Sequence, residues 1–134
     1  DDSVPSLKRF LTDVKDGITP LTIWFRKDVG DNQEAKQELI KVMPENSFQT
    51  PKPIRLIQHI INLSTLKDDI ILDSFAGSGT TAHAVLEQNK EDGGNRKFIL
   101  VETLDYAKDI TAERVKRVIK GYDFIGKDKT TLYE

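Results

Sequence analysis

The residues best suited to bind a ligand lie between positions 69 and 102, where two apolar runs each end at an acidic residue. The first run ends at Asp73, and it is followed by Ser74, Phe75, Ala76, Gly77, Ser78, Gly79, Thr80 and Thr81. Glycines let a backbone approach a ligand closely because they carry no Cβ. The second run ends at Glu102. This pattern predicts a ligand site at the carboxyl ends of two parallel strands.

The charge of Asp73 separates the ligands that such a loop could bind. Gly77-x-Gly79-x-x-Ala82 fits a loose dinucleotide pattern, but a carboxylate four residues before the first glycine would repel a pyrophosphate. A phosphate-binding Walker loop fails more simply, because no lysine follows the second glycine. The carboxylate of Asp73 thus favours a ligand that carries positive charge.

S-adenosylmethionine has a sulfonium and an ammonium beside its carboxylate, and the predicted site matches this distribution of charge. We expect Asp73 to lie near the positive end, directly or through water. Thr80, Thr81 and the start of their helix suit the methionine carboxylate. Glu102 is placed to accept both ribose hydroxyls. The two acidic strand ends, more than the glycine spacing, indicate this cofactor.

The rest of the composition indicates an ordinary soluble domain. The 134 residues carry a net charge of −2 with both signs interspersed, so any contact with DNA should be local or come from residues outside this sequence. The absence of cysteine excludes disulfides and is compatible with the cytoplasm. No run approaches a membrane span, and neither histidine has a partner at metal-ligand spacing. Because the chain starts without Met, we expect a piece of a longer protein.

Helices and strands alternate along the chain, which predicts a parallel α/β unit. An amphipathic segment within 1–19 precedes a strand at 21–25. Asp31 and Glu34 predict a capped helix that Pro44 ends. The further elements are a helix from Pro53 to about 64, a strand ending at Asp73, a helix from the glycine loop to about 89, a strand at 97–102 and a helix at about 106–120. Gly121 is the expected stop of this last helix. We expect a partial Rossmann-like methyltransferase fold, with an N-terminal segment at 1–45 and a cofactor-binding part at 46–134.

The stretch from Asp73 to Thr81 resembles the cofactor motif of DNA amino-methyltransferases, which methylate N6 of adenine or N4 of cytosine. Ser74 stands where this family usually has proline. The segment Thr50-Pro51-Lys52-Pro53 resembles the Thr-x-Lys-Pro segment that lies beside the cofactor. In the circularly ordered β class this segment directly precedes the glycine motif. The resemblance therefore implies that Thr50, Lys52 and Pro53 belong to the cofactor site.

Three other segments, around 20–35, 89–98 and 110–119, resemble modification subunits of type III restriction–modification systems. This resemblance implies an adenine-N6 methyltransferase that acts on DNA, forms a homodimer and pairs with a restriction subunit. The family's catalytic Asp-Pro-Pro-Tyr segment is absent, since none of the five prolines are adjacent. We thus expect the cofactor half of a site, with no catalytic residue and no activity alone. The alternative is a self-contained domain that binds S-adenosylmethionine or a dinucleotide.

Three features allow simpler interpretations. Trp24 and Phe25 could stack on a base, but packing of a strand on the core is the favoured reading. For Phe75, core packing and ligand packing are equally favoured. The basic side chains between 114 and 120, which are Arg114, Lys116, Arg117 and Lys120, fit a solvated helix face near a helix C-terminus.

Overall fold

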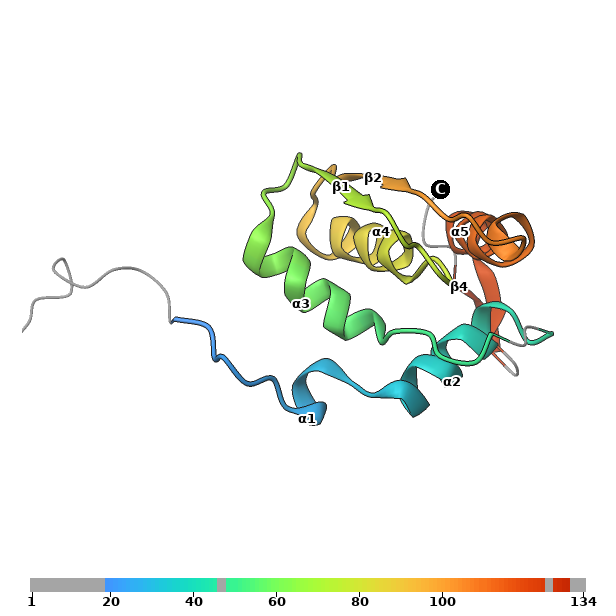
Figure 1. Cartoon of the computed structure of the whole chain (residues 1–134), viewed down its shortest axis with the longest axis horizontal. Helices are drawn as coiled ribbons and strands as arrows, with labels where there is room; N and C mark the ends of the chain where they lie inside the picture. Colours follow the sequence, from blue (N-terminus) through green and yellow to red (C-terminus); the bar gives the residue numbers. More distant parts are fainter. Residues whose placement is uncertain (1–18, 46–47, 125–126, 131–134) are drawn as a thin grey trace, which may run out of the picture.

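The computed structural model describes residues 19–45, 48–124 and 127–130, and the amphipathic segment predicted before residue 19 lies outside them (Figure 1). The elements in chain order are α1 (Arg26–Val29), α2 (Asn32–Val42), α3 (Ile54–Ser64), β1 (Ile70–Asp73), α4 (Thr80–Asp92), β2 (Lys97–Leu100), the π-helix η2 (Ala107–Ala112), α5 (Glu113–Lys120), β3 (Tyr122–Phe124) and β4 (Lys127–Thr130). The predicted alternation of helices and strands from residue 54 to 120 is confirmed.

A small parallel sheet positions the ligand loop. β1 and β2 pair in parallel, with Ile71 opposite Phe98 and Asp73 opposite Leu100. Their carboxyl ends therefore lie side by side, and the loop after β1 and the segment after β2 leave the same edge. The sequence predicted a strand at 97–102 that ends at Glu102, but β2 ends at Leu100, so Glu102 lies two residues beyond the strand.

Two helices cover one face of this sheet (Figure 1). Ile54 and Ile61 of α3 form a buried cluster with Ala84 and Val85 of α4, and Ile71 and Phe98 of the two strands pack against it. The opposite face carries Ile70, Leu72 and Ile99, which are all more than half exposed. Parallel sheets are usually covered on both faces. Within the described residues, however, this sheet is covered on one face only.

The predicted helix after Asp31 is confirmed as α2, and its N-terminal cap forms as expected. The side chain of Asp31 accepts a hydrogen bond from the Glu34 N–H at 2.8 Å. The Glu34 carboxylate does not complete a capping box with the N–H of Asp31. It pairs instead with Arg55 at 2.7 Å, and this pair connects α2 to α3. A second buried cluster joins α2 to α5 and consists of Leu39, Val42, Met43 and Val118.

The predicted strand at 21–25 is wrong. These residues form a bend that leads into α1, and Leu21, Ile23 and Phe25 are more than half exposed. Apolar β-branched residues favour a strand only where neighbouring strands are available to pair and pack with them. This segment runs along α3, away from β1 and β2, so it has no such neighbour among the described strands (Figure 1). The expected core packing of Phe25 is therefore also absent. Trp24 contacts the ring of His59 edge-on, with centroids 4.7 Å apart.

The predicted helix at about 106–120 begins as the π-helix η2 and continues as α5 to Lys120. Gly121 then ends it with φ of +80°, as the sequence indicated. β3 and β4, for which the sequence made no prediction, form an antiparallel pair. π-helical turns are rare and occur often at functional sites, and η2 packs directly below the ligand loop. The predicted division of the chain at residue 45 stays a prediction.

Candidate cofactor site

The loop that joins β1 to α4 is a tight turn held to the end of β2. Ala76 donates its N–H to the Val101 carbonyl at 3.0 Å, and Gly79 donates to the Ala76 carbonyl at 2.8 Å. Gly77 and Gly79 have φ of +53° and +77°, a region that residues with a Cβ rarely adopt. A Cβ on Gly79 would also lie 3.1 Å from the Thr111 carbonyl oxygen. The turn therefore depends on glycine at both positions.

A pocket of about 220 Å³ lies between this loop and residues 48–52. It brings together most of the cofactor residues predicted from the sequence, which are Thr50, Lys52, Asp73, Phe75, Ala76, Gly77, Ser78, Thr80 and Thr81. Phe48, Pro51 and Ile57 complete the wall. Phe75 is 90% exposed, so it is not a core residue. Two segments separated by some twenty residues in the sequence thus form one cavity, as the resemblance implied.

The other predicted residues lie around this pocket. Gly79 is buried inside the turn, and Ser74 faces a neighbouring hollow between α3 and β1. Pro53 caps α3 and packs under Gly30, where an added Cβ would lie 2.9 Å from the Pro53 Cβ. Glu102 does not line the pocket, but its carboxylate accepts a hydrogen bond from the Gly77 N–H of the loop. These four residues support the pocket but do not line it.

Asp73 is fixed by the loop that follows it. One carboxylate oxygen accepts the Phe75 N–H at 3.0 Å, and the other accepts the Thr81 hydroxyl at 2.5 Å. A carboxylate can accept about four hydrogen bonds, so these two leave capacity for a ligand. The side chain is half-buried and belongs to the pocket wall. It therefore presents a negative charge of fixed orientation to whatever binds there.

Glu102 accepts hydrogen bonds from four donors of the protein. One oxygen accepts the Gly77 N–H at 2.9 Å and the Tyr106 hydroxyl at 3.2 Å. The other accepts the N–H groups of Thr103 at 2.8 Å and Leu104 at 3.1 Å. The backbone hydrogen bonds from Leu104 and then Gly77 lower the pKa of Glu102 below its ordinary value. Ribose hydroxyls would have to replace some of these donors, because the carboxylate already holds its usual number.

Arg114, which the sequence assigned to a solvated helix face, is the largest fully buried side chain below the loop. Its Nη1 donates to Ser78 Oγ at 3.0 Å and to Thr80 Oγ1 at 2.9 Å. Its Nε and Nη2 lie 3.3 Å and 3.1 Å from His83 Nδ1. The one signal in the sequence is spacing, because Ile110, Arg114 and Val118 recur every four residues on one face of the helix. This interaction is the part of the site that sequence reasoning missed.

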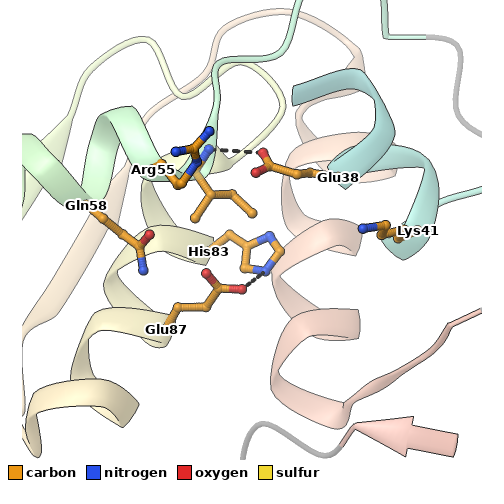
Figure 2. Close-up of a pocket in the computed structure, with 7 residues that line it drawn as sticks. Glu38, Lys41, Arg55, Gln58, His83 and Glu87 are labelled. Carbon is orange, nitrogen blue, oxygen red and sulfur yellow. Dashed lines mark hydrogen bonds and ion pairs between the residues drawn. The ribbon is translucent and has the colours of Figure 1, made fainter. Parts of the chain in front are cut away.

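A second pocket of about 180 Å³ lies on the far side of His83, between α2, α3 and α4 (Figure 2). His83 Nε2 lies 3.1 Å from a Glu87 oxygen, and Glu38 accepts the Ile54 N–H at 3.0 Å. Burial lowers the pKa of His83 and raises the pKa of Glu38. Lys41 and Arg55 also line this pocket, so charges of both signs meet there and no ligand of one charge is favoured.

A membrane-spanning helix and a cluster of metal-ligating side chains are both absent from the described ranges 19–45, 48–124 and 127–130. No helix in these ranges is both long enough and apolar enough to cross a membrane. No three histidine or acidic side chains there lie in an arrangement that could hold a metal ion.

Comparison with known proteins shows the family of the chain. Residues 4–129 match the family model described as DNA methylase. The match covers nearly the whole chain, so the chain belongs to the DNA methylase family.

The individual relatives include modification subunits, as the sequence resemblance indicated. The Mod subunit of the type III restriction-modification enzyme StyLTI from Salmonella typhimurium is 44% identical over 104 residues, which are 78% of this chain and 16% of that protein. The EcoPI Mod subunit of Escherichia phage P1 is 35% identical over 115 residues, or 75% of this chain and 18% of that protein. The type II methyltransferase M.KpnI of Klebsiella pneumoniae is 48% identical over 71 residues, or 53% and 17%. The chain therefore spans about a sixth of the length of these curated relatives.

Proposed function

We propose that the pocket between the glycine loop and residues 48–52 binds S-adenosylmethionine, as the cofactor-binding part of a DNA (adenine-N6) methyltransferase of the type III modification class. The observation that carries this proposal is the Asp73 carboxylate in the pocket wall. A fixed negative charge opposes a pyrophosphate and suits a sulfonium or ammonium group. Membership in the DNA methylase family supports the same cofactor.

The residues of the pocket fit this group. The side chain that Gly77 lacks would lie 3.6 Å from the Phe48 ring, so the glycine leaves room beside an aromatic wall. Asp73 would hold the positive end, and the first N–H groups of α4 would hold the carboxylate. Glu102 would accept the ribose hydroxyls after exchanging some of its present donors. When bound, S-adenosylmethionine supplies an electrophilic methyl group on its sulfonium.

The chain on this proposal holds the cofactor, while the rest of the protein holds the target base. The sequence contains no Asp-Pro-Pro-Tyr segment that could hydrogen-bond a target amino group and stack on a flipped base. The chain alone is then inactive in methyl transfer. The relatives are about six times longer than the matched region. This length supports the proposal that cofactor binding and target-base binding lie in different parts of one polypeptide.

The exposed face of the sheet supports the same arrangement. Ile70, Leu72 and Ile99 are apolar and uncovered, whereas parallel sheets are ordinarily covered on both faces. We propose that the remainder of a Rossmann-like methyltransferase fold covers this face in the longer protein. Several relatives are named as Mod subunits of type III restriction-modification enzymes. From the resemblance to this class we also propose the partners, namely DNA, a second modification subunit and a restriction subunit, and a cytoplasmic location.

Titration calorimetry with the full-length protein tests the cofactor. We expect saturable binding of S-adenosylmethionine and no binding of NAD, and the reverse result would overturn the proposal. Asp73→Ala should weaken binding at least about tenfold, because a charge-assisted contact is lost. Asp68→Ala is the matched control, since Asp68 is exposed and precedes the other end of β1. Unchanged affinity in Asp73→Ala would show that this carboxylate does not face the cofactor.

A further inference from the structure

Arg114 places a positive charge directly beneath the ligand pocket. Its side chain is 0% exposed, and its Nη1 donates to the hydroxyls of Ser78 and Thr80 at 3.0 Å and 2.9 Å. Both hydroxyl residues also line the pocket. The guanidinium is therefore separated from the pocket by a single layer of side chains.

The π-helix η2 makes this approach possible. Thr111, within η2, donates its hydroxyl to the Gly77 carbonyl at 2.5 Å, and its own carbonyl lies against Gly79. Arg114 follows three residues later and contacts Ser78 from the same side. The junction of η2 and α5 thus forms a floor under the whole turn, and the glycine at 79 is what allows the two backbones to come together.

The other edge of the Arg114 guanidinium hydrogen-bonds to the ring of His83 and fixes the tautomer of that ring. Two guanidinium nitrogens lie within 3.3 Å of His83 Nδ1, so that ring nitrogen must be the acceptor. The proton of a neutral His83 is then on Nε2, which faces Glu87 at 3.1 Å. Burial lowers the pKa of His83, in agreement with a neutral ring. Neither the two hydroxyls nor this imidazole nitrogen carries a negative charge.

The two adjacent threonines at the start of α4 hydrogen-bond to side chains of opposite charge. The Thr81 hydroxyl donates to the Asp73 carboxylate, whereas the Thr80 hydroxyl accepts from the Arg114 guanidinium. The wall is thus negative beside one threonine and backed by positive charge beside the next. A zwitterionic ligand with separated cationic and anionic groups matches this arrangement.

We propose that Arg114 is a positioning residue for the carboxylate of the cofactor, which it attracts through the loop by orienting Ser78 and Thr80 and by adding charge behind the N-terminus of α4. This inference rests on the proposed function of the pocket. At an effective dielectric constant of about 20, a charge one side-chain layer away still changes the affinity for an anion by about tenfold or more. Arg114 therefore discriminates between ligands with and without a carboxylate.

The test compares S-adenosylmethionine with its decarboxylated form, which keeps the sulfonium and the ammonium but lacks the carboxylate. Calorimetry with the full-length protein gives the ratio of the two dissociation constants. We expect Arg114→Gln to lower the preference for the carboxylate-bearing ligand about tenfold, and Arg114→Lys to retain part of it. Arg117→Gln is the matched control, because Arg117 lies on the same helix but pairs with Glu45 and Glu113.

A role limited to holding the fold would weaken both ligands by the same factor in Arg114→Gln, and that result overturns the inference. Thr80→Val provides a second test, since it removes the hydroxyl while Arg114 stays in place, even where Arg114→Gln fails to fold. We expect a loss of preference of about threefold, and an unchanged ratio again overturns the inference. Absence of S-adenosylmethionine binding to the wild-type protein would instead overturn the proposed function itself.

Discussion

The Glu102 carboxylate accepts the Gly77 N–H at 2.9 Å, so the segment that follows β2 holds the loop that follows β1. The same oxygen accepts the Tyr106 hydroxyl, and the Tyr106 ring packs edge-on against Phe48, with centroids 5.3 Å apart. Phe48 in turn lines the pocket. The two acidic residues therefore have different roles in this structure, since Asp73 lines the pocket and Glu102 holds the loop at its edge.

Glu102→Gln should loosen the glycine loop without changing the size of the side chain. The amide replaces one acceptor oxygen by a donor, which then faces two protein donors. We expect faster hydrogen exchange of the Gly77 amide and about tenfold weaker S-adenosylmethionine binding. Exchange measured by NMR or mass spectrometry in Glu113→Gln gives the control, because Glu113 pairs with Arg117 on α5. Equal protection of Gly77 in both variants would contradict the role of Glu102 as a brace.

Gly79→Ala should destabilise the protein more than Gly93→Ala. Both glycines have positive φ, at +77° and +67°, but an added Cβ at Gly79 lies 3.1 Å from the Thr111 carbonyl, while nothing lies within 4 Å at Gly93. We expect a loss of about 1 kcal/mol in the free energy of unfolding for Gly93→Ala from backbone strain alone. For Gly79→Ala we expect roughly 2 kcal/mol or more. Urea unfolding of the two variants checks the difference, and equal losses would show that the contact with Thr111 relaxes freely.

Local sequence signals were sufficient for the elements that build the site. The cap of α2 at Asp31, the end of the last helix at Gly121 and the loop from Asp73 to Thr81 each depend on residues that are neighbours in the chain. Their physical causes, which are cap hydrogen bonds and positive φ, act over a few residues. Such features can be predicted without knowledge of the tertiary structure.

The features that the sequence did not reveal depend on partners distant in the chain. Residues 21–25 have strand-like composition, but no strand of the described structure pairs with them. Arg114 looks like a surface cation, yet it is buried because Ser78, Thr80 and His83, more than thirty residues earlier, supply its acceptors. The extra residue per turn in η2 leaves no mark in hydrophobic periodicity, so the register that faces Thr111 and Arg114 towards the loop also escaped prediction.

Glu38→Gln should stabilise the protein at neutral pH. Burial raises the pKa of Glu38, so the folded state holds the proton more tightly than the unfolded state, and stability falls as the pH rises above about 4.5. Glutamine is neutral throughout and keeps an oxygen for the Ile54 N–H. We expect a gain of about 0.5–1 kcal/mol at pH 7, because solvent screening limits the effect, and none near pH 4. Glu34→Gln should instead destabilise, since the hydrogen bond from Arg55 lowers the pKa of Glu34. Urea titrations at both pH values would contradict this prediction if the two variants behaved alike.

His83 should make the protein less stable in mild acid. Burial lowers the pKa of His83 in the folded state. When the pH falls below the ordinary histidine pKa of about 6.5, the unfolded chain therefore binds a proton at this residue that the folded chain does not bind. The free energy of unfolding should then fall by up to about 1.4 kcal/mol per pH unit as the pH drops from 6.5 towards the folded-state pKa. His83→Gln should flatten this dependence between pH 7 and pH 5.5, although its absolute stability will be lower because the contacts with Arg114 and Glu87 change. Thermal or urea unfolding across this pH range measures the slope, and an equally steep fall in His83→Gln would assign the acid sensitivity to other groups.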